Sequence, residues 1–248
     1  MIVHDPRNPR AVALYDDVTA RLPDLDARTD ITVVIGGDGF LLHTVHRFGF
    51  NRSYLGLNGG TLGFLLNDVS GRLDEVCDAI AKDAWIEHRF PLLRARVVRV
   101  DGTEHVDHAM NDVYLERSSG QTARVDVSIS GYGLQRLAAD GMIFATALGS
   151  TAYNFSAGGV PCDPGLPVMC VTPICPHKPR LSPFVVPYGT EASIEVYAPD
   201  RRPVRAVIDG RDVDDVARVT IGPTTHVVRI AYLEGHDFTR QMMEKLLN

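Results

Sequence analysis

A lone aspartate among glycines is the first place in this sequence where chemistry is expected. The segment GGDG at 36–39 follows the β-branched run 31–35, and a second apolar stretch begins directly after it. Glycines let the backbone turn sharply or lie close to a ligand. Backbone amides at such a turn and at a helix N-terminus attract phosphate. The carboxylate of Asp38 would repel that phosphate unless it takes a proton from an attacking hydroxyl or holds a metal ion that accompanies a nucleotide.

The same tetrapeptide has a structural alternative. Asp38 would then only shape the turn, by accepting hydrogen bonds from backbone amides. The GxxxxGK[ST] motif of a P-loop is absent, and GGDG does not match the dinucleotide motif GxGxxG. The tetrapeptide alone therefore leaves the structural and the chemical role of Asp38 open.

A second glycine cluster, GLNGGTLGFLLND at 56–68, follows the next apolar run. It offers another flexible backbone where a strand is expected to end. In open α/β sheets ligands bind at the carboxyl ends of the strands. Asn58 and Phe64 are therefore candidates for ligand contact, although Phe64 would also suit the core.

A third cluster, LAADGMIFATALGSTAYNFSAGG, spans 137–159. Ser150 or Thr151 is expected to cap a short helix that Gly158 and Gly159 end. Tyr153 falls in the first turn of this helix, where its ring could lie against a planar base. An ordinary capped helix in a loop is the structural alternative.

A polar pair, Asn111 and Asp112, interrupts an otherwise apolar run at 109–115. Neighbouring residues of a strand point to opposite faces, so at most one of the two side chains faces a core. The pair predicts a strand end at a cleft, with side chains suited to a sugar diol.

The elements that must position these residues change character near residue 85. Before it, helices and strands alternate, which predicts βαβ units and a parallel sheet. After it, short alternating runs separated by Pro, Gly and Asp predict an all-β sandwich-like domain. The final segment, 236–248, predicts a helix that packs back on the first domain. The expected fold is therefore an N-terminal Rossmann-like α/β domain, 1–86 with 235–248, followed by a β-rich domain, 87–234.

The expected elements can be given by range. Helices are predicted over 10–22, 40–48 and 70–84, the last with Ser70 as its cap, and strands over 31–35 and 54–57. In the β-rich part, strands are predicted over 93–100, 110–116, 124–129, 142–146, 169–172, 192–198, 204–209, 217–221 and 226–233.

Composition narrows the class of protein. The chain has 248 residues, a formal net charge of −6 and no basic tail, so nucleic-acid binding is not expected. No apolar run reaches the length of a membrane span, and no signal-peptide core opens the sequence. The four cysteines show no CxxC spacing, and reduced thiols are a better interpretation than a zinc site. These features predict a cytoplasmic protein without membrane contact.

Six segments together resemble the NAD kinase family and follow its order along the chain. GGDG alone is also found in diacylglycerol kinases, sphingosine kinases and phosphofructokinases. GSTAY with a downstream TPICPH is far more specific. The matching segments are GGDGF (36–40), NGGTLGFL (58–65), MNDV (110–113), ADGMIFAT (139–146), GSTAYNFSAGG (149–159) and VTPICPH (171–177).

The resemblance implies phosphorylation of the 2′-hydroxyl of the adenosine ribose of NAD, giving NADP. ATP or polyphosphate would be the donor, with Mg²⁺, and the enzyme would be a homodimer or homotetramer. By the same resemblance Asp38 accepts the hydroxyl proton, and Asp140 reaches the nicotinamide end across a subunit boundary. Gly37, Gly39, Phe40, Asn58 and Phe64 are the implied contacts near the donor and NAD. Asn111 and Asp112 are implied at the ribose, and Thr151, Ala152 and Tyr153 at the adenine. Ser150, Asn154 and Ser156 belong to the same binding segment, and Asp209 lies in an acidic turn.

The sequence also departs from the family pattern. Ala138 stands where many members carry arginine, and Ala147 and Leu148 replace a proline and a hydroxyl residue. Arginine suits pyrophosphate, so Arg124, Arg136 or Lys178 are candidates to replace it. The opening MIVHDP is the only segment left to supply the family's first strand.

Two other functions compete with an NAD kinase. A lipid or sugar kinase that shares GGDG would leave GSTAY and the Asn111–Asp112 pair without a role. A non-catalytic NAD(P)-binding regulator would explain Ala138 and Leu148, but the intact Asp38 argues against it.

Overall fold

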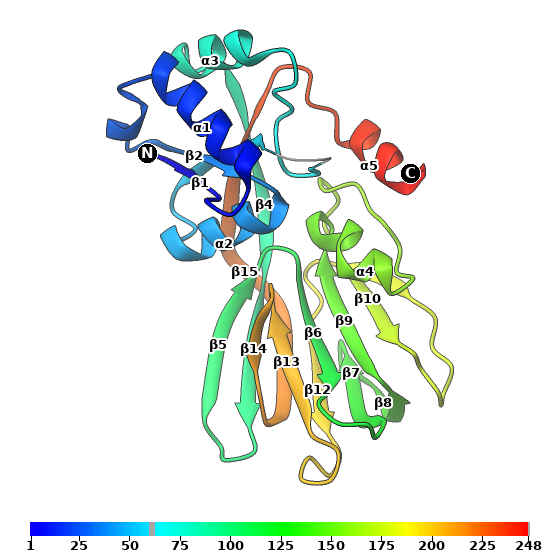
Figure 1. Cartoon of the computed structure of the whole chain (residues 1–248). Coiled ribbons are helices and arrows are strands. Elements are labelled where there is room, and N and C mark those ends of the chain that lie inside the picture. The colour runs from blue at the N-terminus through cyan, green and yellow to red at the C-terminus, as the bar shows by residue number, and fades with distance from the viewer. Residues whose placement is uncertain (60–62, 248) are drawn as a thin grey trace. The chain divides into compact units, whose positions relative to one another are not determined.

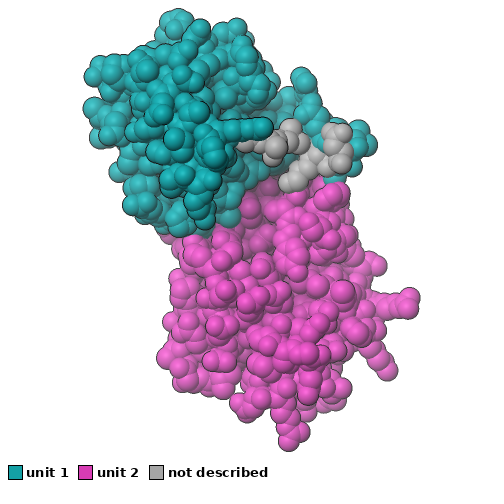
Figure 2. All heavy atoms as spheres, in the orientation of Figure 1, with its two compact units in different colours: residues 1–90, 227–248 teal, residues 91–226 magenta. Residues whose placement is uncertain are grey.

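The computed structural model describes residues 1–59 and 63–247, so part of the NGGTLGFL segment, 60–62, lies outside the described residues. The elements are labelled in Figure 1. The chain divides into two compact units, coloured separately in Figure 2. Unit 1 comprises residues 1–90 and 227–248, and unit 2 comprises residues 91–226.

Unit 1 is built on parallel strands in the order β1–β2–β3–β15. Every residue of β2 is buried, as expected for a strand covered by helices on both faces. The short opening segment does supply a first strand, as expected. The strands are β1 (Ile2–His4), β2 (Ile31–Gly36), β3 (Ser53–Asn58) and the last part of β15 (Val216–Leu233).

Helices cover both faces of this parallel sheet. α1 (Pro9–Arg21) and α3 (Leu73–Ala81) share one hydrophobic core with alternate residues of β2 and β3. α2 (Asp38–Phe48) lies on the opposite face, where Leu41 comes against Gly56. The C-terminal helix α5 (Phe238–Leu247) belongs to unit 1, in agreement with the prediction that it packs back on the first domain.

The predicted helix over 70–84 is too long at both ends. The observed helix α3 begins after Arg72, whose side chain makes no capping hydrogen bond. The prediction that Ser70 caps this helix is therefore wrong. The carboxylate of Asp68 accepts the backbone N–H of Ser70 at 3.0 Å and forms a turn there instead. Local bonds of this type compete with helix formation.

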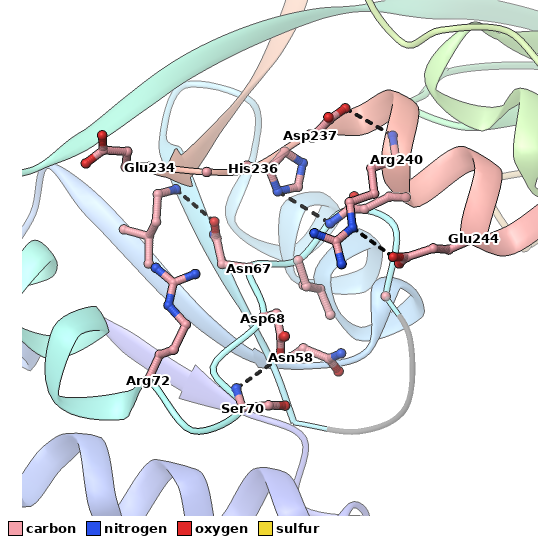
Figure 3. Close-up of a pocket in the computed structure, with 15 residues that line it drawn as sticks. Asn58, Asn67, Asp68, Ser70, Arg72, Glu234, His236, Asp237, Arg240 and Glu244 are labelled. Carbon is pink, nitrogen blue, oxygen red and sulfur yellow. Dashed lines mark hydrogen bonds and ion pairs between the residues drawn. The ribbon is translucent and has the colours of Figure 1, made fainter.

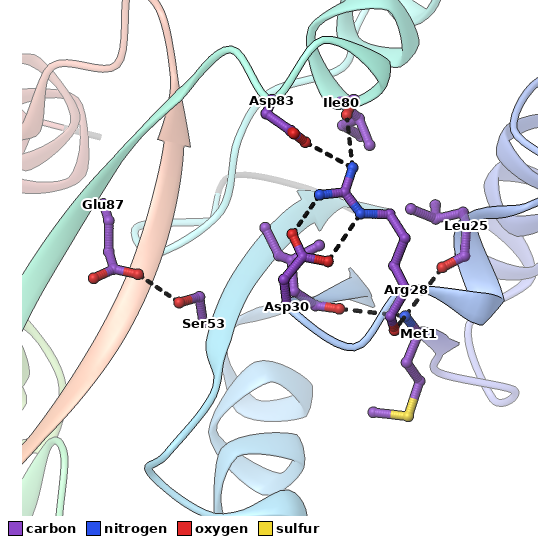
Figure 4. A network of polar contacts seen from close by, with 9 residues as sticks. Met1, Leu25, Arg28, Asp30, Ser53, Ile80, Asp83 and Glu87 are labelled. Atoms are coloured by element: carbon purple, nitrogen blue, oxygen red, sulfur yellow. Dashed lines mark hydrogen bonds and ion pairs between the residues drawn. The ribbon is translucent and has the colours of Figure 1, made fainter.

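A polar network fixes the segment that leads into β2 (Figure 4). The N-terminal ammonium donates to the carbonyl oxygens of Leu25 at 3.0 Å and Arg28 at 2.6 Å. The Arg28 guanidinium pairs with Asp30 and, at 2.7 Å, with Asp83. Burial lowers the pKa of the Met1 ammonium. The network thus ties the start of β2 to the end of α3.

Unit 2 consists of antiparallel strands in two sheets around one hydrophobic core, as the sandwich prediction required. One sheet has the order β11–β10–β9–β6–β13–β14, and the other contains β15–β12–β7–β8 with β4 and β5. The strands are the last part of β4 (Trp85–Arg99), the first part of β15, β5 (Glu104–Ala109), β6 (Asp112–Arg117), β7 (Ala123–Ile129), β8 (Tyr132–Ala139), β9 (Gly141–Thr146), β10 (Val168–Ile174), β11 (Phe184–Pro187), β12 (Ala192–Val196), β13 (Val204–Ile208) and β14 (Arg211–Val213).

All four cysteines are reduced, and three of them are buried. Cys77, Cys162 and Cys170 are buried, Cys175 is exposed, and all four are free thiols. The Sγ atoms of Cys162 and Cys170 lie 3.6 Å apart, and burial raises the pKa of Cys170 to about 12. None of the helices in the described part of the chain has the length and apolar character that a membrane crossing requires.

Candidate functional site

Asp38 lies where β2 ends and α2 begins, as the sequence predicted. Gly37 is the N-cap residue of α2 and Asp38 is its first residue, so the carboxylate sits at the positive end of the helix. Its Oδ2 atom accepts the backbone N–H of Phe64 at 2.9 Å, and its Oδ1 atom accepts that of Leu65 at 3.0 Å. These two bonds join the first glycine loop to the second and fix the orientation of the carboxylate.

The glycines beside Asp38 differ in what surrounds them. A Cβ atom added at Gly37 or Gly39 would meet no heavy atom of residues 1–59 or 63–247 within 4 Å. At Gly36 it would lie 2.9 Å from the Phe40 ring, and at Gly63 it would lie 3.2 Å from Asp38 Oδ1. Packing therefore requires glycine at 36 and restricts position 63, whereas the described residues leave space around positions 37 and 39.

Aromatic rings from the C-terminal segment support the loop that holds Asp38. The Phe64 ring is buried, with its centroid 6.3 Å from that of Phe238 in α5. Phe238 lies edge-on to Tyr232 at 4.9 Å and to His236 at 4.5 Å. Burial lowers the pKa of His236 to about 4. Burial and the charge of Asp38 raise the pKa of Tyr232 well above its usual range.

A cavity of about 370 Å³ opens in unit 1 between the 63–72 segment and α5 (Figure 3). Asn58 lines it, but so do carboxylates and guanidinium groups that already have partners. The Arg240 Nε atom lies 2.9 Å from Glu244 Oε1, and Asp237 accepts the Arg240 backbone N–H at 3.0 Å. The lining therefore carries more carboxylates, Asp68, Glu234, Asp237 and Glu244, than guanidinium groups, Arg72 and Arg240.

In unit 2 the carboxylate of Asp209 organises the segment that carries the Asn111–Asp112 pair. Asp209 and Gly210 form the two-residue turn between β13 and β14, both with positive φ. The Asp209 carboxylate accepts the backbone N–H groups of Met110 at 2.6 Å, Asn111 at 2.9 Å and Asp112 at 3.1 Å. The predicted strand end is confirmed, because β6 begins at Asp112, whereas its place at a cleft stays a prediction.

Asp112 is a buried carboxyl beside a second carboxyl. Its side chain is 5% exposed, and no described ion pair includes it. Burial, with the nearby charge of Asp209, raises the pKa of Asp112 to about 7. The group therefore changes protonation near neutral pH, which suits a side chain that exchanges hydrogen bonds with hydroxyl groups.

Gly149 allows the GSTAY segment to lie directly on the backbone of Asn111. An added Cβ atom would be 2.1 Å from the carbonyl oxygen of Asn111. Thr146 bridges the two segments, since its hydroxyl donates to the Met110 carbonyl at 2.7 Å and accepts the Gly149 N–H at 3.0 Å. Sequence reasoning missed Thr146, although its place between two candidate loops at the end of a predicted strand was a signal.

Ser150 and Asn154 use their polar atoms inside the protein. The Ser150 hydroxyl accepts the N–H of Cys162 at 2.8 Å and donates to its carbonyl at 3.1 Å. The Asn154 amide donates to the carbonyl oxygens of Ser150 at 2.8 Å and Val160 at 3.1 Å, and its Oδ1 atom accepts the Thr172 hydroxyl. The prediction of a hydroxyl cap is wrong, because the helix that follows has Ala152 as its N-cap residue.

The remaining residues of this segment are more accessible. The short helix α4 (Tyr153–Ser156) begins at Tyr153, and Gly158, with φ of +83°, follows its end as predicted. The Tyr153 ring meets the Tyr114 ring edge-on at 4.8 Å. Thr151 is buried, Ala152 and Tyr153 are half-buried, and Ser156 is exposed.

Asp140 has an ionic partner that the sequence did not reveal. The Arg117 Nε atom lies 2.8 Å from Asp140 Oδ1. The two side chains are about one-third exposed, so the pair is screened by water. The ion pair thus joins Arg117, the last residue of β6, to Asp140, the residue that follows β8.

No group of three or more histidine, cysteine, aspartate or glutamate side chains suited to a metal ion occurs among the described residues. Mg²⁺ is commonly held by one or two carboxylates together with substrate phosphates. The single carboxylate of Asp38 fits that pattern only with phosphates present, and the described residues form no separate all-protein cage.

Sequence relatives are NAD kinases. Residues 110–228 match the ATP-NAD kinase C-terminal domain family. The NAD kinase of Rhizobium meliloti is 37% identical over 210 residues, which cover 83% of this chain and 80% of the relative. The NAD kinase of Zymomonas mobilis is 38% identical over 201 residues, with 77% and 75% covered.

Solved structures agree with this result. Yeast NADH kinase, determined in complex with NADH, superimposes with a TM-score of 0.87 at 25% identity, covering 99% of this chain and 86% of the yeast chain. An Archaeoglobus fulgidus NAD kinase shares the fold with a TM-score of 0.76 at 23% identity, covering 99% and 97%. With relatives above 30% identity over most of its length, this chain belongs to the NAD kinase family.

Proposed function

We propose that this chain phosphorylates the 2′-hydroxyl of the adenosine ribose of NAD and releases NADP. The NAD kinase relatives support this reaction, and none of the comparisons favours a lipid or sugar kinase. Within the structure, the observation that carries the proposal is the carboxylate of Asp38. Two backbone amides orient it at the start of α2, beside two glycines that no described residue crowds, Gly37 and Gly39.

The chemistry assigned to Asp38 is general base catalysis. The carboxylate takes the proton of the ribose 2′-hydroxyl, and the oxygen attacks the terminal phosphorus of the donor. The bond from that phosphorus to its bridging oxygen breaks, and the shortened donor leaves with this oxygen. Each carboxylate oxygen that accepts an amide N–H keeps a second lone pair for the incoming proton.

The residues of unit 2 are assigned to NAD. In this proposal Asn111 and Asp112 bind the ribose hydroxyls, and Thr151, Ala152 and Tyr153 contact the adenine. The buried bonds of Ser150, Asn154 and Asp209 support a positioning role for these three, because their polar atoms hold neighbouring backbone. The NADH complex of the yeast relative supports a dinucleotide substrate.

The donor and assembly complete the proposal. The family description supports ATP as the donor, with polyphosphate as the other candidate. Mg²⁺ would arrive with the donor phosphates and neutralise their charge, and no step is assigned to it here. The family resemblance supports a cytoplasmic homodimer or homotetramer in which Asp140 serves a neighbouring subunit.

The test is detection of NADP by mass spectrometry after the purified protein is incubated with NAD, ATP and Mg²⁺, with NADH in a parallel reaction. Asp38→Asn should lower NADP formation about a hundredfold or more, as expected for loss of a general base. One backbone amide also loses its acceptor, so a modest fall in melting temperature is expected.

The matched control is Asp16→Asn, which makes the same chemical change on an exposed position of α1. Its rate should equal that of the unchanged protein. Near-full turnover by Asp38→Asn would contradict the role of Asp38 as base, and absence of any phosphorylated dinucleotide would contradict the reaction itself.

A further inference from the structure

Two buried cysteines of unit 2 lie side by side next to the GSTAY segment. Cys162 is in the loop between α4 and β10, and Cys170 is in β10 (Figure 1). Their Sγ atoms are 3.6 Å apart. Both side chains belong to a hydrophobic cluster with Ile143 and Ala145, against which the Tyr153 ring packs. We name Cys162 and Cys170 the buried thiol pair.

The two sulfur atoms are close enough to form a bond after a small movement. A disulfide bond is about 2 Å long, so the sulfurs must approach each other by about 1.5 Å. Cys170 is held in the middle of a sheet, because it pairs with Ala145 of β9 on one side and with Val185 of β11 on the other. Cys162 lies outside the strands and therefore makes most of the movement.

The loop that carries Cys162 is hydrogen-bonded to the GSTAY segment. The Ser150 hydroxyl accepts the Cys162 N–H at 2.8 Å and donates to the Cys162 carbonyl oxygen at 3.1 Å. The Val160 carbonyl oxygen accepts the Asn154 amide at 3.1 Å. The same carbonyl oxygen lies 3.8 and 3.6 Å from the two thiol sulfurs. A shift of Cys162 toward β10 therefore disturbs the bonds that Ser150 makes.

The two thiols differ in their access to an oxidant. Cys170 is 1% exposed, and burial raises its pKa to about 12, so its thiol stays protonated at neutral pH. Cys162 is 8% exposed. A small oxidant therefore reaches the Cys162 sulfur first, and Cys170 is placed to react second. In the part of the chain that the structure describes, no further ligand side chain completes a metal site with the pair.

We propose that the buried thiol pair is a reversible redox switch, in which hydrogen peroxide converts Cys162 and Cys170 to a disulfide and the bridge displaces the loop bonded to Ser150. The Cys162 sulfur attacks one peroxide oxygen, the O–O bond breaks, and water leaves behind a sulfenic acid. The Cys170 sulfur then attacks the Cys162 sulfur. The S–S bond forms, the S–O bond breaks, and the Cys170 proton leaves with the oxygen as a second water. The thiols lose two electrons, one peroxide becomes two waters, and dithiothreitol reverses the bridge by thiol exchange.

The consequence for NAD rests on the proposed function. Thr151, Ala152 and Tyr153 are assigned to the adenine, and Ser150 directly precedes them. Displacement of Ser150 should raise KM for NAD about fivefold, as expected when about one hydrogen bond is lost. Because Asp38 belongs to unit 1 and is not bonded to this loop, kcat should change little.

The experiment treats the purified full chain with hydrogen peroxide and compares it with the reduced protein. Peptide mass spectrometry should locate a bond between Cys162 and Cys170, with the loss of two hydrogen atoms, and dithiothreitol should restore both thiols. Hydrogen–deuterium exchange should be faster over 150–162 in the oxidised protein, because the bonds between Ser150 and Cys162 are disturbed. Neither measurement depends on NADP formation.

Single-cysteine variants provide the controls. Cys170→Ala should form no bridge and should show the exchange of the reduced protein after peroxide treatment. Cys77→Ala, the matched control, removes another buried thiol from α3 and should respond as the unchanged protein does. Cys175→Ser should also respond fully, because it removes only the exposed thiol. If Cys170→Ala does not fold, Cys162→Ala replaces it.

Two results would overturn the switch. One is the absence of a Cys162–Cys170 bond at a peroxide concentration that oxidises the exposed Cys175. The other is a bond that leaves exchange over 150–162 unchanged. Failure of NAD to bind either form, with the bond and the faster exchange present, would instead contradict the proposed function and leave the switch supported.

Discussion

At Gly149 an added Cβ atom would lie 2.1 Å from the Asn111 carbonyl oxygen, whereas at Gly37 it would meet no atom of the described residues within 4 Å. The first glycine is required by packing between two protein segments. The second has a φ of −108° that any residue adopts, and none of the described residues packs closely enough to require glycine there. Approach of a phosphate group to the backbone would explain it.

These two positions therefore provide an opposed pair of alanine variants. Gly149→Ala should lower the free energy of unfolding by about 1–3 kcal/mol, as overpacking does, and weaken NAD binding. Gly37→Ala should leave thermal unfolding nearly unchanged but lower kcat/KM for the phosphate donor. Differential scanning calorimetry and steady-state kinetics distinguish the two. A fully active Gly37→Ala enzyme would show that donor phosphates do not approach this glycine.

Asp112 predicts a pH dependence with a definite sign. Burial and Asp209 raise its pKa in the folded protein from 3.8 to about 7. The folded state then binds the proton more tightly than the unfolded state does. Its favourable contribution is complete below pH 3.8 and is lost as the pH rises through about 7. Three pKa units correspond to roughly 4 kcal/mol at most.

Asp112→Asn should remove this dependence, because asparagine does not titrate. The free energy of unfolding of the variant, relative to the unchanged protein, should rise from pH 4 to about pH 7 and then level off. Urea unfolding at several pH values measures it. Parallel stability curves for the two proteins would mean that Asp112 is ionised in the folded state throughout this range.

The sequence identified the candidate site residues better than it identified the groups to which they are hydrogen-bonded. Asp38, Asp112 and Tyr153 stood out because a carboxylate or ring interrupts an apolar or glycine-rich run. The role of Asp209 as acceptor of three amides from 110–112 depends on residues about a hundred positions away. Likewise, Ser150 bonds the backbone of Cys162 rather than capping its own helix. Sequence patterns carry no record of such distant bonds.

At the scale of elements, α5 stabilises the loop that orients Asp38. Phe64 donates its backbone N–H to Asp38 and packs its ring near Phe238. Phe238 in turn meets Phe90 and Tyr232 edge-on, at 5.9 and 4.9 Å. The C-terminal helix thus supports Asp38 indirectly. Phe238 packs near the Phe64 ring, and the Phe64 backbone N–H donates to the Asp38 carboxylate. Phe238 is in this sense a positioning residue.

Phe238→Ala should lower kcat more than it changes KM for NAD, because the amides at Asp38 lose their support. The half-buried ring should also cost about 1–3 kcal/mol of unfolding free energy. Phe238→Leu should restore part of both. Met243→Ala, a control on an exposed position of the same helix, should change neither. If Phe238→Ala were destabilised but turned over at the full rate, the effect of α5 would be structural only.

Elements were predicted best where they are buried. The fully buried β2 and the apolar β9 were found from their sequences, whereas β5, β8 and β14 were missed because exposed polar residues interrupt their patterns. The strands predicted over 217–221 and 226–233 form the single strand β15. A Gly-Pro pair at 222–223 suggested a break there, but backbone pairing with different neighbours on either side maintains the strand.

At the scale of the whole molecule, the assembly proposed from the family resemblance has each active site completed by a neighbouring subunit. Asp38 would act from one chain and Asp140 from its partner. A closed symmetric oligomer uses the same surface on every copy, so both halves of the site would form together. Asp140 is part of a surface ion pair with Arg117, and such exposed pairs contribute little to folding. Asp140→Asn should therefore fold normally and reveal its effect in catalysis.

Complementation between inactive chains tests this assembly. Asp38→Asn and Asp140→Asn proteins are prepared separately and mixed under conditions in which subunits exchange, verified by mass spectrometry of differently labelled chains. Some mixed sites then combine an intact Asp38 with an intact Asp140 from the other chain, so NADP formation should rise above the sum of the separate activities. Arg47→Ala mixed with Asp38→Asn serves as the exchange control, since Arg47 is an exposed residue of α2. Verified exchange without recovery, or full turnover by a diluted monomer, would show that each chain carries a complete site.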